Sequence, residues 1–261
     1  MLIDTHAHLD FPEFEGEIGA LVERAAQAGV RRIVTIGTSL ESSRRAVAIA
    51  EAHPAIYAAI GIHPGSATEA EPDALAGLRA LAKSPRVVAI GETGLDYYRL
   101  EGIDDAAVKA AQASVFQAQL DLAAECGLNV VIHQRGDCLD DTLRLLAPYQ
   151  GKLQAVFHCF GGSPETAAAL IALGHLVSFT GIVTFKNAAL MQAAAASVPD
   201  GSYMVETDCP YLAPVPFRGK RCEPAFTRQT AEKIAALRNQ PLEQVAAATT
   251  ATAEAFFQWS R

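Results

Sequence analysis

The chain has 261 residues, half of them hydrophobic, and its 21 basic and 29 acidic side chains give a formal net charge of −8. This acidic balance argues against a long basic track along nucleic acid, although a small basic patch is compatible with it. No apolar run reaches the roughly 18 residues of a membrane span, and the first residues form a strand pattern rather than a signal sequence. We therefore expect a soluble, cytoplasmic monomer without a membrane partner.

Short apolar runs alternate with amphipathic or alanine-rich stretches along the whole chain, without a low-complexity linker. The runs predict strands at 2–5, 32–36, 57–62, 87–91, 129–133, 154–158, 176–180 and 203–207. The intervening stretches predict helices at 17–28, 40–51, 73–82, 105–125, 138–147, 164–172, 188–196 and 226–238, with a final helix at 242–259. Eight such pairs favour one α/β domain over residues 1–261, a (β/α)8 TIM barrel in which each helix covers its strand. An open doubly wound sheet is the alternative.

Side chains that bind metal ions follow five of the predicted strands. The first strand leads into His6-Ala7-His8, and alternate side chains of a strand share a face, so the two histidines can contact one ion. The complete set, called the six candidate ligands below, is His6, His8, Glu92, His133, His158 and Asp208. Because the carboxyl ends of barrel strands face one mouth, we expect the six to line one pocket. An open sheet would gather ligands only around its switch point.

Any one of these residues alone is more simply interpreted as a structural histidine or a surface carboxylate, but their shared position at strand ends favours metal binding. Six ligands suit two divalent ions better than one. We predict that His6, His8 and Asp208 hold one ion. The histidines after the fifth and sixth strands would hold the other, with Glu92 as the bridge. Histidine suits zinc, manganese or iron and carboxylates also accept magnesium, so the metal stays open among Mg, Mn and Zn.

Glu92 and Asp208 are the predicted catalytic residues. Two ions in such a site generate hydroxide near neutral pH and neutralise the charge that develops on a phosphoryl or carbonyl oxygen, and Asp208 can orient or deprotonate the attacking water. Hydrolysis is therefore the predicted chemistry. His53 stands before a proline at a helix end and His175 precedes the seventh strand, so we predict that neither binds metal.

Six segments carry a family resemblance that runs nearly end to end. They are residues 4–10 (DTHAHLD), 61–64 (GIHP), 91–98 (GETGLDYY), 132–135 (IHQR), 158–162 (HCFGG) and 206–212 (ETDCPYL). With these segments the chain resembles the TatD family of metal-dependent hydrolases and deoxyribonucleases, within the amidohydrolase-like barrels. The resemblance implies a (β/α)8 barrel with a two-metal centre on the same six candidate ligands, and magnesium-dependent cleavage of DNA from 3′ ends.

Two segments depart from the family pattern. Cys222 stands where the family usually has asparagine, in a loop that this asparagine can order. After residues 132–135 the family commonly continues with an acidic residue, whereas here Gly136 comes first and Asp137 is one position late. The role of this acidic residue is therefore open.

Five further residues are predicted to bind substrate: His63, Arg135, Arg218, Lys220 and Arg221. Arginine can bind a phosphate through two parallel hydrogen bonds, and the last three form the densest basic cluster of the chain. Ordinary alternatives are a turn-capping histidine, a surface salt bridge and a solvated loop.

Some neighbours of the candidate ligands have expected supporting roles. Tyr97, Tyr98 and Phe160 can stack on a terminal base or simply pack. Asp96 and Glu206 are expected to support loops or to orient histidine rings.

Three functions are compared. The leading hypothesis is a deoxyribonuclease of the 3′–5′ exonuclease type that acts on DNA ends or another small anionic substrate, because the basic residues favour phosphate. The second is a hydrolase of small amides or esters. The third is a catalytically silent binding protein, which the intact ligand set disfavours.

Overall fold

The computed structural model describes residues 1–71, 73–98, 100 and 105–259. Its strands are β1 Leu2–Ala7, β2 Val30–Ile36, β3 Ile56–Ile60, β4 Val87–Asp96, β5 Asn129–Arg135, β6 Ala155–Phe157, β7 Leu176–Phe179 and β8 Tyr203–Val205. Its α-helices are α1 Ile18–Gln27, α2 Leu40–Ala52, α3 Ala74–Leu81, α4 Asp105–Cys126, α5 Leu139–Leu146, α6 Pro164–Ala172, α7 Ala189–Ser197, α8 Thr227–Arg238 and α9 Leu242–Phe257. Short 3-10 helices follow several strands, among them η1 Pro12–Phe14 and η2 Pro64–Glu69.

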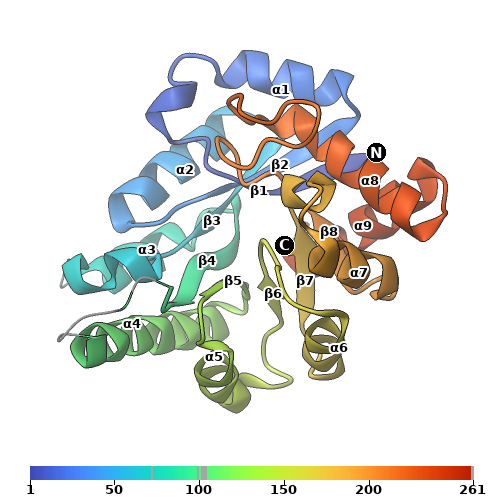
Figure 1. Ribbon diagram of the computed structural model, residues 1–261. Coiled ribbons are helices and arrows are strands. Elements are labelled where there is room, and N and C mark those ends of the chain that lie inside the picture. Colours follow the sequence, from blue (N-terminus) through green and yellow to red (C-terminus); the bar gives the residue numbers. More distant parts are fainter. Residues whose placement is uncertain (72, 99, 101–104, 260–261) are drawn as a thin grey trace.

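The strands pair in parallel in chain order from β1 to β8, and the helices surround them (Figure 1). The ring closes between its first and last strands. The Asp208 N–H donates to the His6 carbonyl at 2.8 Å, and the His8 N–H donates to the Cys209 carbonyl at 2.8 Å. This closure confirms the predicted TIM barrel and excludes the open sheet.

All eight predicted strands and nine predicted helices are present, with differences at their ends. The largest difference is in β4, which was expected to stop at Gly91 and instead continues to Asp96. Its last part pairs with β5, up to Asp96 opposite Arg135, after a register shift between Ile90 and Thr93. Irregular pairing of this kind turns a side chain out of the regular alternation. Glu92 lies within this irregular stretch, so its side chain does not have to follow the regular alternation of inward and outward positions.

Gly94 allows the two strands to approach each other in this region. Its φ of +137° is unfavourable for other residues, and a Cβ there would lie 2.0 Å from the carbonyl oxygen of His133. The sequence analysis placed the end of the strand at Gly91, whereas the fold has both Gly91 and Gly94 inside β4.

A buried apolar cluster fills the barrel, and α9 closes its amino end with Phe256 and Phe257. Val131, Val156 and Met204 belong to this cluster. Side chains two positions apart on a strand share a face. The residues two positions after these three therefore continue the inner face toward the carboxyl end of the barrel. These later residues are His133, His158 and Glu206. The alternation thus brings ionisable groups to the mouth from an apolar interior.

His175 lies at the opposite end from this mouth. It is buried beside the ring of Phe157, and its Nδ1 accepts a hydrogen bond from the Ala155 N–H at 3.4 Å. Among the described residues, no helix is both long and apolar enough to cross a membrane.

Candidate metal centre

The structure gathers the six candidate ligands at the carboxyl end of the barrel. They come from β1 and the residue after it, β4, β5, and the segments that follow β6 and β8. Glu92 is buried between two groups of nitrogen atoms and directs one carboxylate oxygen at each. Its Oε2 lies 3.4 Å from His6 Nε2, and its Oε1 lies 2.7 Å from His133 Nδ1 and 2.8 Å from His158 Nε2. This arrangement would suit a carboxylate shared between two ions.

The first group contains His6, His8 and Asp208, together with Glu92. His8 Nε2 lies 3.3 Å from His6 Nε2 and 3.3 Å from Asp208 Oδ1, and His6 Nε2 lies 3.7 Å from that oxygen. A tetrahedral ion with ligand distances of about 2.1 Å separates its ligand atoms by about 3.4 Å. The donor atoms and their spacing therefore fit one divalent ion without rearrangement.

The second group contains His133 and His158 on the other oxygen of Glu92. The two ring nitrogens that face this oxygen lie 3.5 Å from each other. Both nitrogen-to-oxygen contacts with Glu92 have hydrogen-bond lengths. They are shorter than the distance of about 3.4 Å between two ligand atoms of one tetrahedral ion. The donor set fits a second ion if these two rings withdraw from Glu92 by roughly half an ångström.

A carboxylate lies behind each histidine of the second group, within hydrogen-bond distance for His133 and slightly beyond it for His158. Asp96 Oδ2 lies 3.1 Å from His133 Nε2, so Nδ1 is the atom of this ring that faces the centre. Glu206 Oε1 lies 3.6 Å from His158 Nδ1, and the same carboxylate accepts hydrogen bonds from the Cys159 N–H at 2.7 Å and the Ser178 hydroxyl at 2.6 Å. Both residues are where the sequence analysis expected them. Carboxylates in such positions fix the tautomer and orientation of metal-binding histidines.

The charges of the two candidate catalytic carboxylates suit a cation site. Burial would raise the pKa of Glu92, but the charge on His158 and hydrogen bonds with His133 and His158 hold it well below its ordinary value. Burial likewise opposes ionisation of Asp208, whereas the hydrogen bond from His8 and the charge of His6 lower its pKa. Both groups are anions at neutral pH and can attract divalent ions.

His63 lies at the edge of the second group. Its Nε2 is 3.2 Å from His133 Nδ1 and 3.7 Å from Glu92 Oε1, close enough to suggest a further ligand. However, its Nδ1 accepts the Gly65 N–H at 2.9 Å, and burial lowers its pKa to about 4. A neutral ring whose Nδ1 accepts must carry its proton on Nε2, which makes that atom a hydrogen-bond donor rather than a ligand.

A cavity of about 300 Å³ opens onto the centre. It is lined by His8, Phe11, Thr38, His63, Ser66, Glu92, His133, His158, Asp208 and Tyr211. Of the five predicted substrate-binding residues, only His63 lines this cavity within the described chain. Neither Phe11 nor Tyr211 was expected from the sequence to have a role in the site. Each stands three positions after a candidate ligand, in a loop at the mouth, and that spacing is the signal that could have identified them.

The predicted basic residues make other contacts. The guanidinium of Arg221 pairs with Glu17 at 2.8 Å, and that of Arg218 lies 4.3 Å from the ring centre of Phe185. Lys220 Nζ lies 6.0 Å from the ring centre of Phe217, and the guanidinium of Arg135 covers the exposed ring of Tyr98 at 4.1 Å. These contacts fit surface cations, and any binding of substrate by them would involve atoms outside the cavity.

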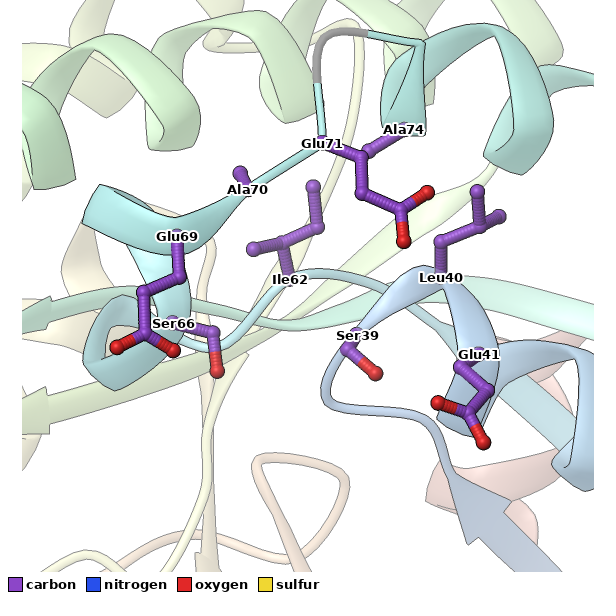
Figure 2. A pocket seen from close by; sticks show the side chains of 9 residues that line it. All are labelled: Ser39, Leu40, Glu41, Ile62, Ser66, Glu69, Ala70, Glu71 and Ala74. Atoms are coloured by element: carbon purple, nitrogen blue, oxygen red, sulfur yellow. The ribbon is translucent and has the colours of Figure 1, made fainter.

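A second hollow, of about 210 Å³, adjoins the cavity and shares Ser66 with it. Side chains from the segment after β3 face side chains from the start of α2 across this hollow (Figure 2). Three of its residues, Glu41, Glu69 and Glu71, are acidic. One side of the mouth is therefore unfavourable for a polyanion.

Known proteins resemble this chain over its whole described length. A family model described as TatD related DNase matches residues 3–258. "Uncharacterized metal-dependent hydrolase YabD" of Bacillus subtilis is 39% identical over 259 residues, which is 99% of each chain. "3'-5' ssDNA/RNA exonuclease TatD" of Enterobacter lignolyticus is 35% identical and aligns over 95% of each chain. The crystal structure of YjjV, a TatD homolog from Escherichia coli K12, is 32% identical with a TM-score of 0.90, and the match covers 98% of both chains.

Proposed function

The chain belongs to the family of TatD-related DNases, and from this premise we propose that it is a divalent-metal-dependent deoxyribonuclease that hydrolyses phosphodiester bonds from the 3′ ends of strands. The observation that carries the proposal is Glu92, whose two oxygens each face a separate group of nitrogen atoms. The proposal includes two bound ions, with magnesium, manganese and zinc as the candidates. We further propose that the enzyme is a monomer, which gel filtration tests, and that it is cytoplasmic, which cell fractionation tests.

The proposed mechanism assigns a task to each side chain. His6, His8 and Asp208 would hold one divalent ion and His133 and His158 a second, with Glu92 shared between them. When bound, such ions would make hydroxide available near neutral pH and would offset the charge on the attacked phosphate. The anionic Asp208 orients the attacking water and accepts its proton. The Nε2–H of neutral His63 donates to a phosphate oxygen.

The acidic hollow beside the cavity favours a path for the bound strand that leads away from it. Phosphates that follow the reacting one would be repelled by Glu69 and Glu71, which face the hollow. Arg135 is the last residue of β5, on a different part of the mouth, and exposes its guanidinium over Tyr98. We place the outgoing strand on the side of Arg135, away from the hollow.

Nucleotide release from end-labelled DNA tests the function. Metal-stripped protein is resupplied with magnesium, manganese or zinc, and single-stranded DNA, double-stranded DNA and RNA are offered in parallel. We expect release from 3′ ends with at least one ion, and loss of release in Asp208→Asn. Absence of release with every ion would contradict the proposal. A panel of amides and esters would then test the second candidate function, for which the same hydroxide would attack a carbonyl carbon.

A further inference from the structure

Two aromatic side chains line the cavity beside the first group of candidate ligands. The ring of Phe11 stacks on the imidazole of His8 with ring centres 5.0 Å apart, and it meets the ring of Tyr211 edge to face with centres 6.0 Å apart. Tyr211 is 53% exposed, although large aromatic side chains are usually mostly buried. The cavity therefore joins an anionic, metal-binding floor to an aromatic wall.

The backbone that carries this wall is held firmly on both sides. The turn before Phe11 is anchored by Asp10, which accepts hydrogen bonds from the Ser42 hydroxyl at 2.7 Å and from Arg45 at 3.1 Å. The turn of Tyr211 is tied to the candidate ligand itself, because the Tyr211 N–H donates to the Asp208 carbonyl at 3.0 Å. The rings are thus positioned in advance while their surface stays open, which lowers the entropy cost of binding a flat ligand.

We propose that Phe11 and Tyr211 form a stacking surface for the terminal base of a nucleic-acid strand whose phosphate lies at the metal centre. This inference rests on the proposed function and names the part of the substrate that the wall recognises. A nucleotide has a planar base, which matches the aromatic wall, and an anionic phosphate, which divalent ions bound at the floor would attract. A small amide or ester without a ring matches only the polar floor. Every base has a π-face, so the surface accepts any of the four.

The three aromatic residues that the sequence analysis suggested for stacking have other contacts. The ring of Tyr98 is covered by the guanidinium of Arg135. Tyr97 donates its hydroxyl to Asp141 at 3.0 Å, and Phe160 is buried with its ring against Phe179. Apart from histidines, the aromatic residues that line the cavity in the described chain are Phe11 and Tyr211.

Quenching of a fluorescent base tests the stacking directly. The probe is a single strand with 2-aminopurine at its 3′ terminus and a terminal phosphorothioate linkage that resists hydrolysis, and it is added to the metal-loaded protein. We expect quenching on binding, and about tenfold weaker binding in Tyr211→Leu and in Phe11→Leu, equivalent to about 1.4 kcal/mol each. Tyr211→Phe keeps the ring and should retain wild-type affinity. Leu173→Ala removes an exposed apolar side chain beside His175, at the opposite end of the barrel, and is the control.

A second measurement uses the wild-type protein alone and so does not depend on the folding of a variant. Strands that end in an abasic residue should bind about tenfold more weakly than strands that end in a base. Equal binding of the two, absence of quenching, or loss of affinity in Leu173→Ala but not in Tyr211→Leu would each overturn the inference. Quenching without cleavage would uphold the stacking surface and contradict the nuclease. Cleavage at equal rates with and without a terminal base would uphold the nuclease and contradict the stacking surface.

Discussion

At its amino end the barrel is filled by apolar side chains from the strands and from α9, whereas at its carboxyl end the same strands lead into histidines and carboxylates. Phe256 and Phe257 are almost fully buried at the first end, and Glu92 is almost as buried at the second. Burying a phenyl ring stabilises the fold, but burying a carboxylate costs free energy unless cations or hydrogen bonds compensate it. Similar burial therefore stabilises the fold at one end and holds charged groups ready for a cation at the other.

Removal of Glu92 should have the largest effect and should act on one end only. In Glu92→Ala both groups lose their shared ligand, so we expect loss of both ions and a fall in activity of about a thousandfold or more. The apolar end is untouched, so circular dichroism should report a folded barrel. Metal content is measured by elemental analysis, with Glu92→Gln as the matched variant of similar shape. Turnover near the wild-type rate in Glu92→Ala would rule out the bridging role.

Truncation of Phe257 should produce the opposite pattern. The ring packs against Phe256 and Trp259 with ring centres 4.9 Å away in each case. We expect Phe257→Ala to lower the free energy of unfolding by about 3–5 kcal/mol in urea titrations, because it leaves a cavity in the core. Metal content and activity of the folded fraction should stay close to wild type. Phe257→Leu should lose less, and a variant that kept its stability but lost its metal would contradict the separation of the two ends.

The support of His133 by Asp96 should have an intermediate effect. Asp96→Asn keeps the shape of the side chain but removes the charge beside His133 Nε2. Loss of such a partner typically weakens metal binding or activity 10–100-fold, and we expect this fall in metal affinity by competition with a chelator. The urea midpoint of the metal-free protein should change little. An unchanged affinity would show that the ring is oriented by other contacts.

Asp4 connects the two ends and should affect only the pH dependence of stability. Its buried carboxyl group accepts hydrogen bonds from the Thr207 N–H at 2.9 Å and hydroxyl at 2.6 Å, and burial raises its pKa from 3.8 to about 8. The folded protein keeps a proton that the unfolded chain releases, so stability falls as the pH rises from 3.8 to about 8 and levels off above that. Asp4→Asn should reduce this slope in urea titrations of the metal-free protein between pH 5 and 8. A slope equal to that of wild type would contradict the assignment.

The smallest expected effect concerns the acidic side of the mouth. Glu69→Gln combined with Glu71→Gln removes two charges, so DNA cleavage should become about two- to threefold faster at low salt and unchanged at high salt, where screening removes the repulsion. Glu243→Gln with Glu254→Gln, on α9, removes the same charge elsewhere and serves as control. Equal acceleration by both pairs would indicate an effect of net charge alone.

The sequence predicted the fold well because its signals are local. Each strand shows a continuous apolar run, and each helix an apolar face, so the order of elements follows from the pattern of residues. The six candidate ligands were identified for the same reason, since all of them follow such runs and parallel strands end at one edge. The features that the sequence did not predict depend on contacts between residues distant in sequence. The extension of β4 past Gly91 requires pairing with β5, and the engagement of Arg221 requires Glu17, 204 positions away.

The identity of the ligand atoms was also out of reach. A sequence names His133 but not which of its nitrogens faces the centre, and that choice is made by Asp96. The aromatic wall was missed because Phe11 and Tyr211 lie in loops without periodicity. Their positions follow from hydrogen bonds made by neighbouring residues.

The hydrogen bond from Asp208 to the His6 carbonyl has a consequence for biosynthesis. The first group of candidate ligands takes residues from both ends of the chain, and the barrel closes between these same residues. A ribosome must therefore synthesise most of the protein before His6 and His8 can meet Asp208. A chain that terminates before residue 208 lacks Asp208, so it would not carry the complete first group of the proposed active centre.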